Sequence, residues 1–391
     1  MKRFSSQYLI TNSGPMLKRA VVTTSDDGTI LNIQDTKGAL TEAHSIEFHN
    51  GIIIPGFVNC HCHLELSHMK GAISPGSGLG TFIEQIINKR HSTVDRIIDT
   101  ACSADNDMYK RGISLCADIC NTTESFNIKN KSRIQYINLI EVFGMDPDKA
   151  SHCLDEVIRI SINAKEMNLP FSLVPHSLYS MSLSLLRLLR KQSLQNKVTS
   201  LHFMETSGES AFLRNKTGPL MTSYMRTGLI PTRLETAGNH ADAILTEITP
   251  SGNLILVHNT FADRKTIKTV LKRKNLYWCL CPNSNYYIEK TMPPVNLLIE
   301  EGCEIVIGTD SLASNSRLDI LSELITLQSN FQTVSLEDLV RWATLNGAKA
   351  LGEEDKFGKI EPGKKPGLLL LGNVDLQNMK LLPDSFVTRL V

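Results

Sequence analysis

The amino-acid sequence predicts an α/β protein: a (β/α)8 barrel of the TIM type, with a small β-sandwich domain built from both termini. Three observations support this fold class. Short apolar runs recur eight times through the middle of the chain, helical patterns fill most of the intervals between them, and both ends carry strand and turn patterns. A chain of 391 residues is long enough for such a barrel and an appended domain.

The eight apolar runs are expected to form the parallel strands of the barrel, because a strand that is buried on both faces reads as a continuous apolar segment. The interval between the second and third runs is short and polar, so this is the weakest unit of the pattern. In chain order the runs span 52–59, 113–118, 134–139, 171–175, 198–202, 254–258, 277–281 and 305–310.

The intervals between the runs contain apolar residues at helical spacing, which predicts helices that cover the sheet with one face. Strands that alternate with helices favour a closed parallel sheet. The three clearest stripes are Phe82, Ile83, Ile86 and Ile87; Leu185, Leu186 and Leu189; and Ile320, Leu321, Leu324 and Ile325.

The two ends of the chain have a different pattern from the middle. Short β-type segments separated by Gly- and Asp-rich turns occupy the first 50 residues, and they resemble antiparallel strands. The tail also reads as β-structure. We therefore expect residues 1–54 and 355–391 to form the small β-sandwich domain, and residues 55–354 to form the barrel that carries the catalytic site.

Charge and cysteine content restrict the function classes. The formal net charge is +1, so the chain lacks the basic excess typical of nucleic-acid or anionic-membrane binding. No apolar stretch is long enough to span a bilayer, and the basic N-terminus has no signal-peptide core. The nine cysteines are irregularly spaced, which predicts reduced thiols and a cytoplasmic protein.

The first apolar run ends in His61 and His63. Because residues i and i+2 of a strand point to the same face, both imidazoles are expected to project together while Cys62 faces away. Two imidazoles held side by side can begin a zinc or iron site. An isolated pair of this kind more often consists of two surface histidines, so the remainder of the chain decides between these interpretations.

Further polar groups follow other predicted strands. His202 ends the fifth run and Glu205 lies three residues beyond it, His258 ends the sixth run, and Asp310 ends the eighth. An aspartate after an apolar run is costly to bury unless a partner such as a metal ion lies beside it. Active sites of such barrels lie at the carboxyl ends of the strands, so all these groups are expected on one face.

Other catalytic motifs are absent from the sequence. There is no His-Glu-x-x-His helix, no glycine-rich phosphate loop and no Gly-x-Ser-x-Gly nucleophile elbow. His63-Leu64-Glu65 matches half of the nucleoside-deaminase zinc motif, but no Pro-Cys-x-x-Cys follows it. These absences leave the strand-end groups as the candidate site.

The full set of motifs resembles the amidohydrolase superfamily, and most closely its cytosine deaminase/chlorohydrolase branch, which includes aminofutalosine, adenosylhomocysteine and guanine deaminases. The likeness extends from about Gly51 to Pro362. It is carried by the segments 55–66, His202-x-x-Glu205, His258 and 308–315, and 175–180 and 281–285 are similar to segments that line the substrate pocket in the family. The tail departs from the family pattern, because 364–368 lacks the usual acidic residue.

The resemblance implies a role for each group. His61, His63, His202 and Asp310 would bind one divalent metal ion, with Zn²⁺ preferred and Fe²⁺ also compatible with the ligands. Glu205 would shuttle protons, His258 would hold the attacking water, and Asp310 would also act in catalysis. The fourth strand does not end in a lysine, so a carbamylated lysine that bridges two metal ions is not expected.

The pocket and the partners are predicted less specifically. The expected partner is a small heterocyclic substrate, with neither nucleic acid nor membrane involved, and a homodimer is expected because dimers are common in the family. Candidate substrate contacts are Glu65, Glu141, His176, Asn285 and Ser311. For Glu65, support of the metal-binding histidines or a salt bridge is favoured over substrate contact.

Three functions remain open at the level of sequence. The first is a metal-dependent aminohydrolase (deaminase) of a purine-like heterocycle or a modified adenosine, in which activated hydroxide attacks the ring carbon that bears the amino group. The second is a chlorohydrolase or cyclic amidohydrolase that uses the same hydroxide. The third is a non-catalytic binding protein on the same barrel, which the intact Glu205, His258 and Asp310 disfavour.

Overall fold

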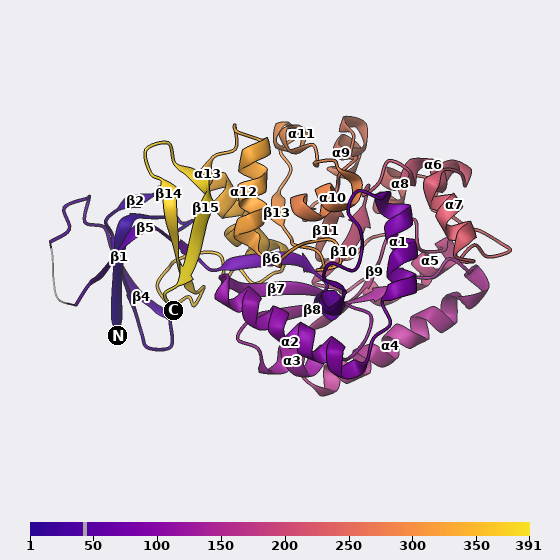
Figure 1. The fold of residues 1–391 in the computed structure, drawn as a ribbon, viewed down its shortest axis with the longest axis horizontal. Helices are drawn as coiled ribbons and strands as arrows, with labels where there is room; N and C mark the ends of the chain where they lie inside the picture. Colours follow the sequence, from indigo (N-terminus) through magenta and orange to yellow (C-terminus); the bar gives the residue numbers. More distant parts are fainter. Residues whose placement is uncertain (42–44) are drawn as a thin grey trace.

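The structure is a computed structural model that describes residues 1–41 and 45–391. A β-rich part that holds both termini lies beside a larger part in which strands and helices alternate (Figure 1). The candidate site belongs to the larger part.

The strands of the larger part form two four-stranded parallel sheets, in the orders β6-β7-β8-β9 and β10-β11-β12-β13. The prediction of an α/β fold with parallel strands is therefore confirmed. The strands are β6 (Phe57–Cys62), β7 (Ile113–Cys120), β8 (Gln135–Val142), β9 (Phe171–Pro175), β10 (Val198–Phe203), β11 (Asn253–His258), β12 (Leu276–Leu280) and β13 (Ile305–Ile307).

Short parallel contacts join the two sheets just beyond the carboxyl ends of their outer strands. Ser177 pairs with His202, and Cys62 pairs with Asp310. The amide of His202 donates to the carbonyl of His176 at 2.8 Å, and the amide of Asp310 donates to the carbonyl of His61 at 3.0 Å. The carboxyl ends of β6, β9, β10 and β13 therefore meet where the predicted site residues lie.

Helices follow most of these strands and cover their outer faces (Figure 1). The short helix η1 and the π-helical turn η3 complete this layer. The elements are η1 (Leu64–Met69), α1 (Gly78–Lys89), α2 (Val94–Lys110), α3 (Phe126–Lys131), η2 (Pro147–Lys149), α4 (Ala150–Glu166), α5 (Leu183–Ser193), α6 (Glu209–Asn215), α7 (Pro219–Arg226), α8 (His240–Thr246), α9 (Arg264–Val270), α10 (Pro282–Glu289), α11 (Val295–Glu300), α12 (Ile320–Asn330), α13 (Leu336–Arg341), η3 (Trp342–Asn346) and α14 (Gly347–Ala350).

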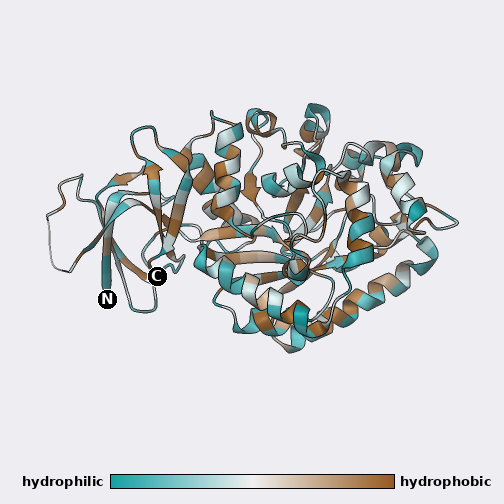
Figure 2. Ribbon diagram, in the orientation of Figure 1, coloured by the Kyte–Doolittle hydropathy of each residue, from teal (hydrophilic) through white to brown (hydrophobic). Residues whose placement is uncertain are grey.

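The three predicted apolar stripes all lie on helices, and hydrophilic and hydrophobic residues alternate along the helices in Figure 2. Leu185 and Leu189 of α5 and Leu324 of α12 are fully buried, as expected for stripes that pack on a sheet. The stripe of α1 differs, because its four members are only half-buried and all of them line a cavity.

The terminal part is a seven-stranded sheet, in the order β15-β14-β5-β1-β3-β4, with β2 paired to β1. The predicted antiparallel pairing is present between β1 and β3 and between β3 and β4, whereas β1 and β5 run parallel. β1 and β5 are distant in sequence, so no local sequence pattern indicates that they pair or in which direction. Its strands are β1 (Lys2–Leu9), β2 (Leu17–Lys18), β3 (Val21–Thr24), β4 (Ile30–Gln34), β5 (Glu47–Pro55), β14 (Leu368–Asp375) and β15 (Lys380–Arg389).

The first predicted barrel strand, 52–59, is divided between the two parts of the molecule. β5 ends at Pro55 in the terminal sheet, and β6 begins at Phe57 in the parallel sheet. Gly56 lies at the division, where a Cβ would stand 2.4 Å from the carbonyl oxygen of Pro366 and 2.2 Å from Oγ of Ser114. A residue without a side chain is therefore required where the chain passes between the sheets.

None of the helices within residues 1–41 and 45–391 combines the length and apolar character needed to cross a membrane. All nine cysteines lie in the described residues and are free thiols. Six of them are buried, at positions 60, 62, 116, 120, 279 and 281.

Candidate metal centre and active-site cavity

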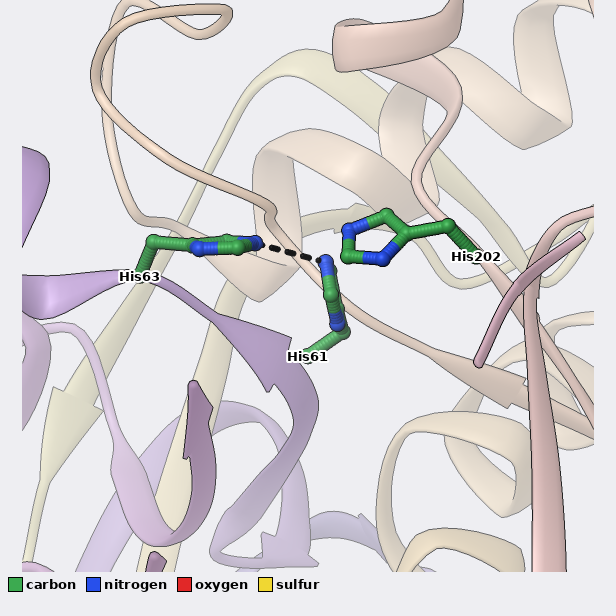
Figure 3. Close-up of side chains that lie close together, drawn as sticks. All are labelled: His61, His63 and His202. Atoms are coloured by element: carbon green, nitrogen blue, oxygen red, sulfur yellow. Dashed lines mark hydrogen bonds between the residues drawn. The ribbon is translucent and has the colours of Figure 1, made fainter. Parts of the chain in front are cut away.

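Three histidines converge at the carboxyl ends of β6 and β10. Ligand atoms of His61, His63 and His202 all lie within 4.8 Å of one another, and all three side chains are buried. Their rings point toward a common centre, and Nε2 of His63 lies 3.1 Å from Nε2 of His61 (Figure 3). The structure thus brings together the three predicted imidazole ligands, which fit a divalent cation that prefers nitrogen donors.

Backbone contacts determine which nitrogen of His202 faces the cluster. Its Nδ1 lies 2.9 Å from the carbonyl oxygen of His176, and a carbonyl can only accept a hydrogen bond. Nδ1 therefore carries the proton, which leaves the lone pair of Nε2 for a metal ion. This tautomer is the one that a metal-ligating histidine with an Nδ1 hydrogen bond to a carbonyl adopts.

Asp310 supplies the carboxylate of the cluster. Its Oδ1 lies 3.7 Å from Nε2 of His61 and 3.5 Å from Nε2 of His63. Its Oδ2 accepts hydrogen bonds from the hydroxyls of Ser284 at 2.5 Å and Ser314 at 2.6 Å, so the carboxylate cannot rotate freely. Burial raises the pKa of Asp310, but the neighbouring histidines outweigh this effect and hold it well below its usual range.

The backbone is left-handed at four positions near the carboxyl ends of strands at the site: φ is +48° at Met204, +75° at His258, +57° at Asn259 and +58° at Asp310. Residues other than glycine rarely adopt this conformation, and such strain tends to occur at functional sites. In this protein it turns the chain sharply after β10, β11 and β13.

Burial keeps the histidines of the cluster neutral. It lowers the pKa of His61, lowers the pKa of His63 to about 3, and lowers the pKa of His202 well below its ordinary value. Because a metal ion binds the neutral imidazole, these residues need not lose a proton near neutral pH before they bind one.

Glu205 faces the cavity from the loop after β10. Its Oε2 accepts a hydrogen bond from the hydroxyl of Tyr179 at 2.8 Å, and its Oε1 lies 3.6 Å from Nε2 of His258. Burial raises the pKa of Glu205 to about 7, which outweighs the opposing effects of His258 and Tyr179. A carboxyl group with a pKa near neutrality can both accept and return a proton.

Asn285 orients His258. Oδ1 of Asn285 lies 2.9 Å from Nδ1 of His258, and Nδ2 of Asn285 donates to the His258 carbonyl at 3.2 Å. Nε2 of His258 is buried and has no hydrogen-bond partner within residues 1–41 and 45–391. Burial lowers the pKa of His258, but Glu205 and Asp310 outweigh this effect and raise it. Its Nε2 is therefore available to a bound molecule.

His63, His202, Glu205, His258 and Asp310 line one cavity of about 290 Å³, and many of its other lining side chains are apolar. The lining residues are His63, Leu66, Leu79, Phe82, Ile83, Ile86, Ile87, Arg90, Asn121, Glu141, Phe143, Gly144, Met145, His176, Tyr179, Ser180, His202, Glu205, Tyr224, Leu229, His258, Asp310 and Ser311.

Three of the five predicted substrate contacts, Glu141, His176 and Ser311, line this cavity. Glu65 and Asn285 do not, which differs from the prediction. Oε2 of Glu65 accepts hydrogen bonds from the backbone of Asn121 and from the backbone and side chain of Thr122. Glu65 therefore stabilises the loop that follows β7. Asn285 holds His258 instead.

The sequence did not predict the buried ion pair beneath the metal cluster. Nζ of Lys129 lies 2.5 Å from Oδ2 of Asp118, and both side chains are completely buried. Oδ1 of Asp118 accepts from the amide of Leu64 at 2.7 Å, directly after His63. The pair thereby supports the end of β6. A lysine three residues after Phe126 in a polar interval gave no signal of this role.

Glu141 makes the stability of the protein depend on pH. Burial raises its pKa from 4.5 to about 8. The folded state therefore favours the protonated carboxyl, and the associated stability is present below about pH 4.5 and is lost as the pH rises through about 8. We compare the free energy of unfolding of Glu141→Gln with that of the wild type. This difference is expected to shift in favour of Glu141→Gln by about 2–4 kcal/mol from about pH 5 to about pH 9.

Urea unfolding of both proteins with a metal chelator present measures this difference. Burial also raises the pKa of Glu323 to about 8. Both proteins contain Glu323, so its contribution to the pH dependence cancels in the difference between them. An equal difference in unfolding free energy at the two pH values would contradict the expectation.

The family model described as "Amidohydrolase family" matches residues 52–388. This chain belongs to the amidohydrolase family. The match confirms the resemblance that the strand-end motifs indicated, and it covers the cavity and all the residues described above. As an amidohydrolase, the protein is a metal-dependent hydrolase that acts on carbon–nitrogen bonds other than peptide bonds.

Individual relatives support the same family. The amidohydrolase is 26% identical to an adenosine deaminase of Helicobacter pylori over 342 residues, which are 83% of this chain and 80% of the relative. The structure of Helicobacter pylori aminofutalosine deaminase in complex with methylthio-coformycin has a TM-score of 0.81 and 21% identity, with 100% of both chains covered. A zinc-bound adenosine deaminase of Xanthomonas campestris has a TM-score of 0.67 and 21% identity, with 97% and 86% covered. These two structures share the fold.

Proposed function

We propose that this amidohydrolase is a deaminase that replaces the amino group of an adenine-type nucleoside with oxygen and releases ammonia. The main support is that Glu205 and His258 lie in the same part of one cavity as the histidine cluster and Asp310. The Helicobacter pylori relative, named an adenosine deaminase, supports the choice of ring.

One divalent ion, Zn²⁺ in preference to Fe²⁺, would be held by His61, His63, His202 and Asp310. The donor set fits, because the three imidazoles are buried and neutral and Oδ1 of Asp310 faces two of them. Such an ion lowers the pKa of a water molecule toward neutrality and so provides hydroxide. The zinc-bound Xanthomonas campestris structure supports the choice of zinc.

The side chains around the cluster would move the protons of the reaction. Asp310 accepts a proton from the attacking water, and His258 donates a hydrogen bond to the new oxygen. Glu205 protonates the ring nitrogen beside the reacting carbon. The new carbon–oxygen bond would form first, as the ring carbon–nitrogen double bond opens and its nitrogen takes the proton from Glu205. Asp310 would then pass its proton to the amino group, so that the exocyclic carbon–nitrogen bond breaks and ammonia leaves, and Glu205 would regain a proton from the new hydroxyl as the carbonyl forms. Water and the amino heterocycle thus give the oxo heterocycle and ammonia.

The far end of the cavity would accept an apolar substituent of the substrate. Helix α1 contributes Phe82, Ile83, Ile86 and Ile87, and Phe143 and Leu229 face the same cavity. A polar ribose hydroxyl gains little there, whereas an alkyl or alkylthio group is removed from water. A nucleoside such as 5′-deoxyadenosine or 5′-methylthioadenosine therefore fits this cavity better than adenosine.

The broader organisation is part of the same proposal. The two parallel sheets would be halves of one closed (β/α)8 barrel formed by 55–354, and 1–54 with 355–391 would form a β-sandwich domain. The contacts between β9 and β10 and between β13 and β6 support closure. A homodimer in the cytoplasm remains the expectation for the assembled protein.

Ammonia release from a panel of substrates tests the function. Adenosine, 5′-deoxyadenosine, 5′-methylthioadenosine, guanine and cytosine are compared, and chloride release from a chlorotriazine is measured in parallel. Ammonia from the 5′-modified adenosines supports the proposal. Chloride release alone would favour the chlorohydrolase, and binding of a nucleoside without turnover by metal-loaded protein would favour the non-catalytic binding protein.

The apolar end of the cavity makes a separate prediction. Ile87→Asn is expected to raise KM for 5′-methylthioadenosine by about tenfold and to leave kcat nearly unchanged, because a contact of similar strength in the ground and transition states is lost. Steady-state kinetics measure both constants. The matched control is Ile162→Asn on α4, where the isoleucine is 51% exposed and lies outside the cavity. Equal KM values for the two variants would contradict the assigned substrate pose.

A further inference from the structure

Another buried glutamate, Glu209, accepts hydrogen bonds from the loop that carries Glu205. Glu209 is the first residue of α6 and is only 1% exposed. It does not line the cavity, so it cannot contact a substrate there. A buried carboxylate without partners would be strongly destabilising, so its contacts indicate why it is present.

The carboxylate of Glu209 accepts three consecutive backbone amides. Oε2 accepts from Met204 at 3.2 Å, and Oε1 accepts from Glu205 at 2.5 Å and from Thr206 at 3.1 Å. These amides belong to the turn in which Met204 adopts its left-handed φ. The contacts therefore stabilise an otherwise unfavourable backbone conformation at the residue directly before Glu205.

His240 completes the contacts of this carboxylate from a different helix. Its Nε2 lies 2.9 Å from Oε2 of Glu209, and a carboxylate can only accept, so Nε2 carries the proton. The ring of His240 packs edge-on against Phe203 of β10, with centroids 5.4 Å apart. Each oxygen of Glu209 therefore accepts two hydrogen bonds, and α8 is joined to the turn after β10.

We propose that Glu209 is a positioning residue for catalysis: together with His240, it fixes the backbone of 204–206 so that the carboxyl group of Glu205 faces His258 and the cavity. The inference rests on the proposed proton-transfer role of Glu205. Glu209 acts through the backbone, and a displacement of the Glu205 carboxyl by a fraction of an ångström would lengthen the proton-transfer path.

Glu209→Gln is the principal test. The glutamine amide retains the size of the side chain but presents N–H groups to backbone N–H donors, so part of the network is lost. We expect kcat for the favoured nucleoside to fall by about 10²-fold and KM to change by less than about threefold, because proton transfer is affected and binding is not.

The pH profile of kcat gives a second readout. The groups that face Glu205 are Tyr179, His258, Asp310 and Glu209, and the negative charge of Glu209 raises the pKa of Glu205. Removal of that charge should lower the pKa of Glu205. The part of the pH profile of kcat that follows the ionisation of Glu205 should therefore move to lower pH. A profile in which this part stays at the wild-type pH in Glu209→Gln would contradict an effect of Glu209 on Glu205.

Two further variants separate positioning from folding. Asp105→Asn is the matched control, because Asp105 is a buried carboxylate that accepts from the hydroxyls of Ser132 and Tyr136 and lies outside the cavity. Its kcat should equal that of the wild type. His240→Phe keeps a ring against Phe203 but removes the donor to Glu209, and it should lower kcat by about three- to tenfold.

Hydrogen exchange of the 204–206 amides tests the network without any substrate. Exchange at these amides should accelerate in Glu209→Gln while the other strand-end amides exchange at the wild-type rate. Unchanged exchange, or a kcat within about threefold of the wild type in folded Glu209→Gln, would overturn the inference. A wild-type protein without turnover would instead refute the proposed function, and the exchange data would still decide whether Glu209 holds the turn.

Discussion

Glu205→Gln is expected to lower kcat by about 10³-fold, with the fold and metal content unchanged. Glutamine has the size of glutamate and can still accept the hydrogen bond from Tyr179 that Glu205 accepts at 2.8 Å. It cannot take up and return a proton, which is the role that a carboxyl with a pKa raised by burial to about 7 can fill. Initial rates of ammonia release at saturating substrate measure the effect.

The control is Glu156→Gln on α4, whose side chain is 58% exposed and lies outside the cavity. Its kcat should match that of the wild type. KM for Glu205→Gln should stay within about threefold of the wild type, because the substrate pocket keeps its shape. If Glu205→Gln turned over substrate at the wild-type rate, Glu205 would not be the proton shuttle.

His61→Ala is expected to abolish activity and to reduce bound metal from about one ion per chain to near zero. The His61 imidazole is fully buried between His63 and His202, with ring centroids 4.8 Å away in both cases. Elemental analysis of protein purified after zinc supplementation measures the metal.

Chelation should produce the same loss in the wild type, and added Zn²⁺ should restore activity there but not in His61→Ala. His152→Ala, at an exposed histidine on α4, is the control and should keep both metal and activity. Full activity in chelated wild-type protein would exclude the proposed chemistry.

The sequence predicted the site best where functional side chains occupy alternate residues of a strand or the end of a strand. His61 and His63 were predicted to point to one side because a strand has a period of two. His202 and His258 lie at the carboxyl ends of β10 and β11, Asp310 follows β13, and the carboxyl ends of parallel strands meet at one face. His63, His202, His258 and Asp310 line one cavity, and His61 lies against His63 and His202.

The residues that sequence reasoning misplaced or missed depend on loops and on long-range packing. Glu65 and Asn285 were named as candidate substrate contacts, but the helices η1 and α10, on which they lie, direct them to Thr122 and His258. Local sequence patterns do not encode the direction of these helices. The pairing of Glu209 with His240, 31 residues away, likewise had no periodic signal.

The stripe of α1 shows a related ambiguity. Phe82, Ile83, Ile86 and Ile87 predicted a helix, and the helix is present. The same stripe would serve equally well to pack on a sheet or to line a cavity, because both environments are apolar. Only the three-dimensional arrangement shows that it faces the cavity, and this decides the kind of substrate that the protein can accept.

The central claim is that one metal ion lies among His61, His63, His202 and Asp310. A crystal structure of zinc-supplemented protein, with anomalous diffraction collected at the zinc absorption edge, tests it most directly. The account predicts a single strong peak within bonding distance of the three imidazoles and the Asp310 carboxylate. A peak elsewhere, or no peak at this position in enzyme that still releases ammonia, would contradict it.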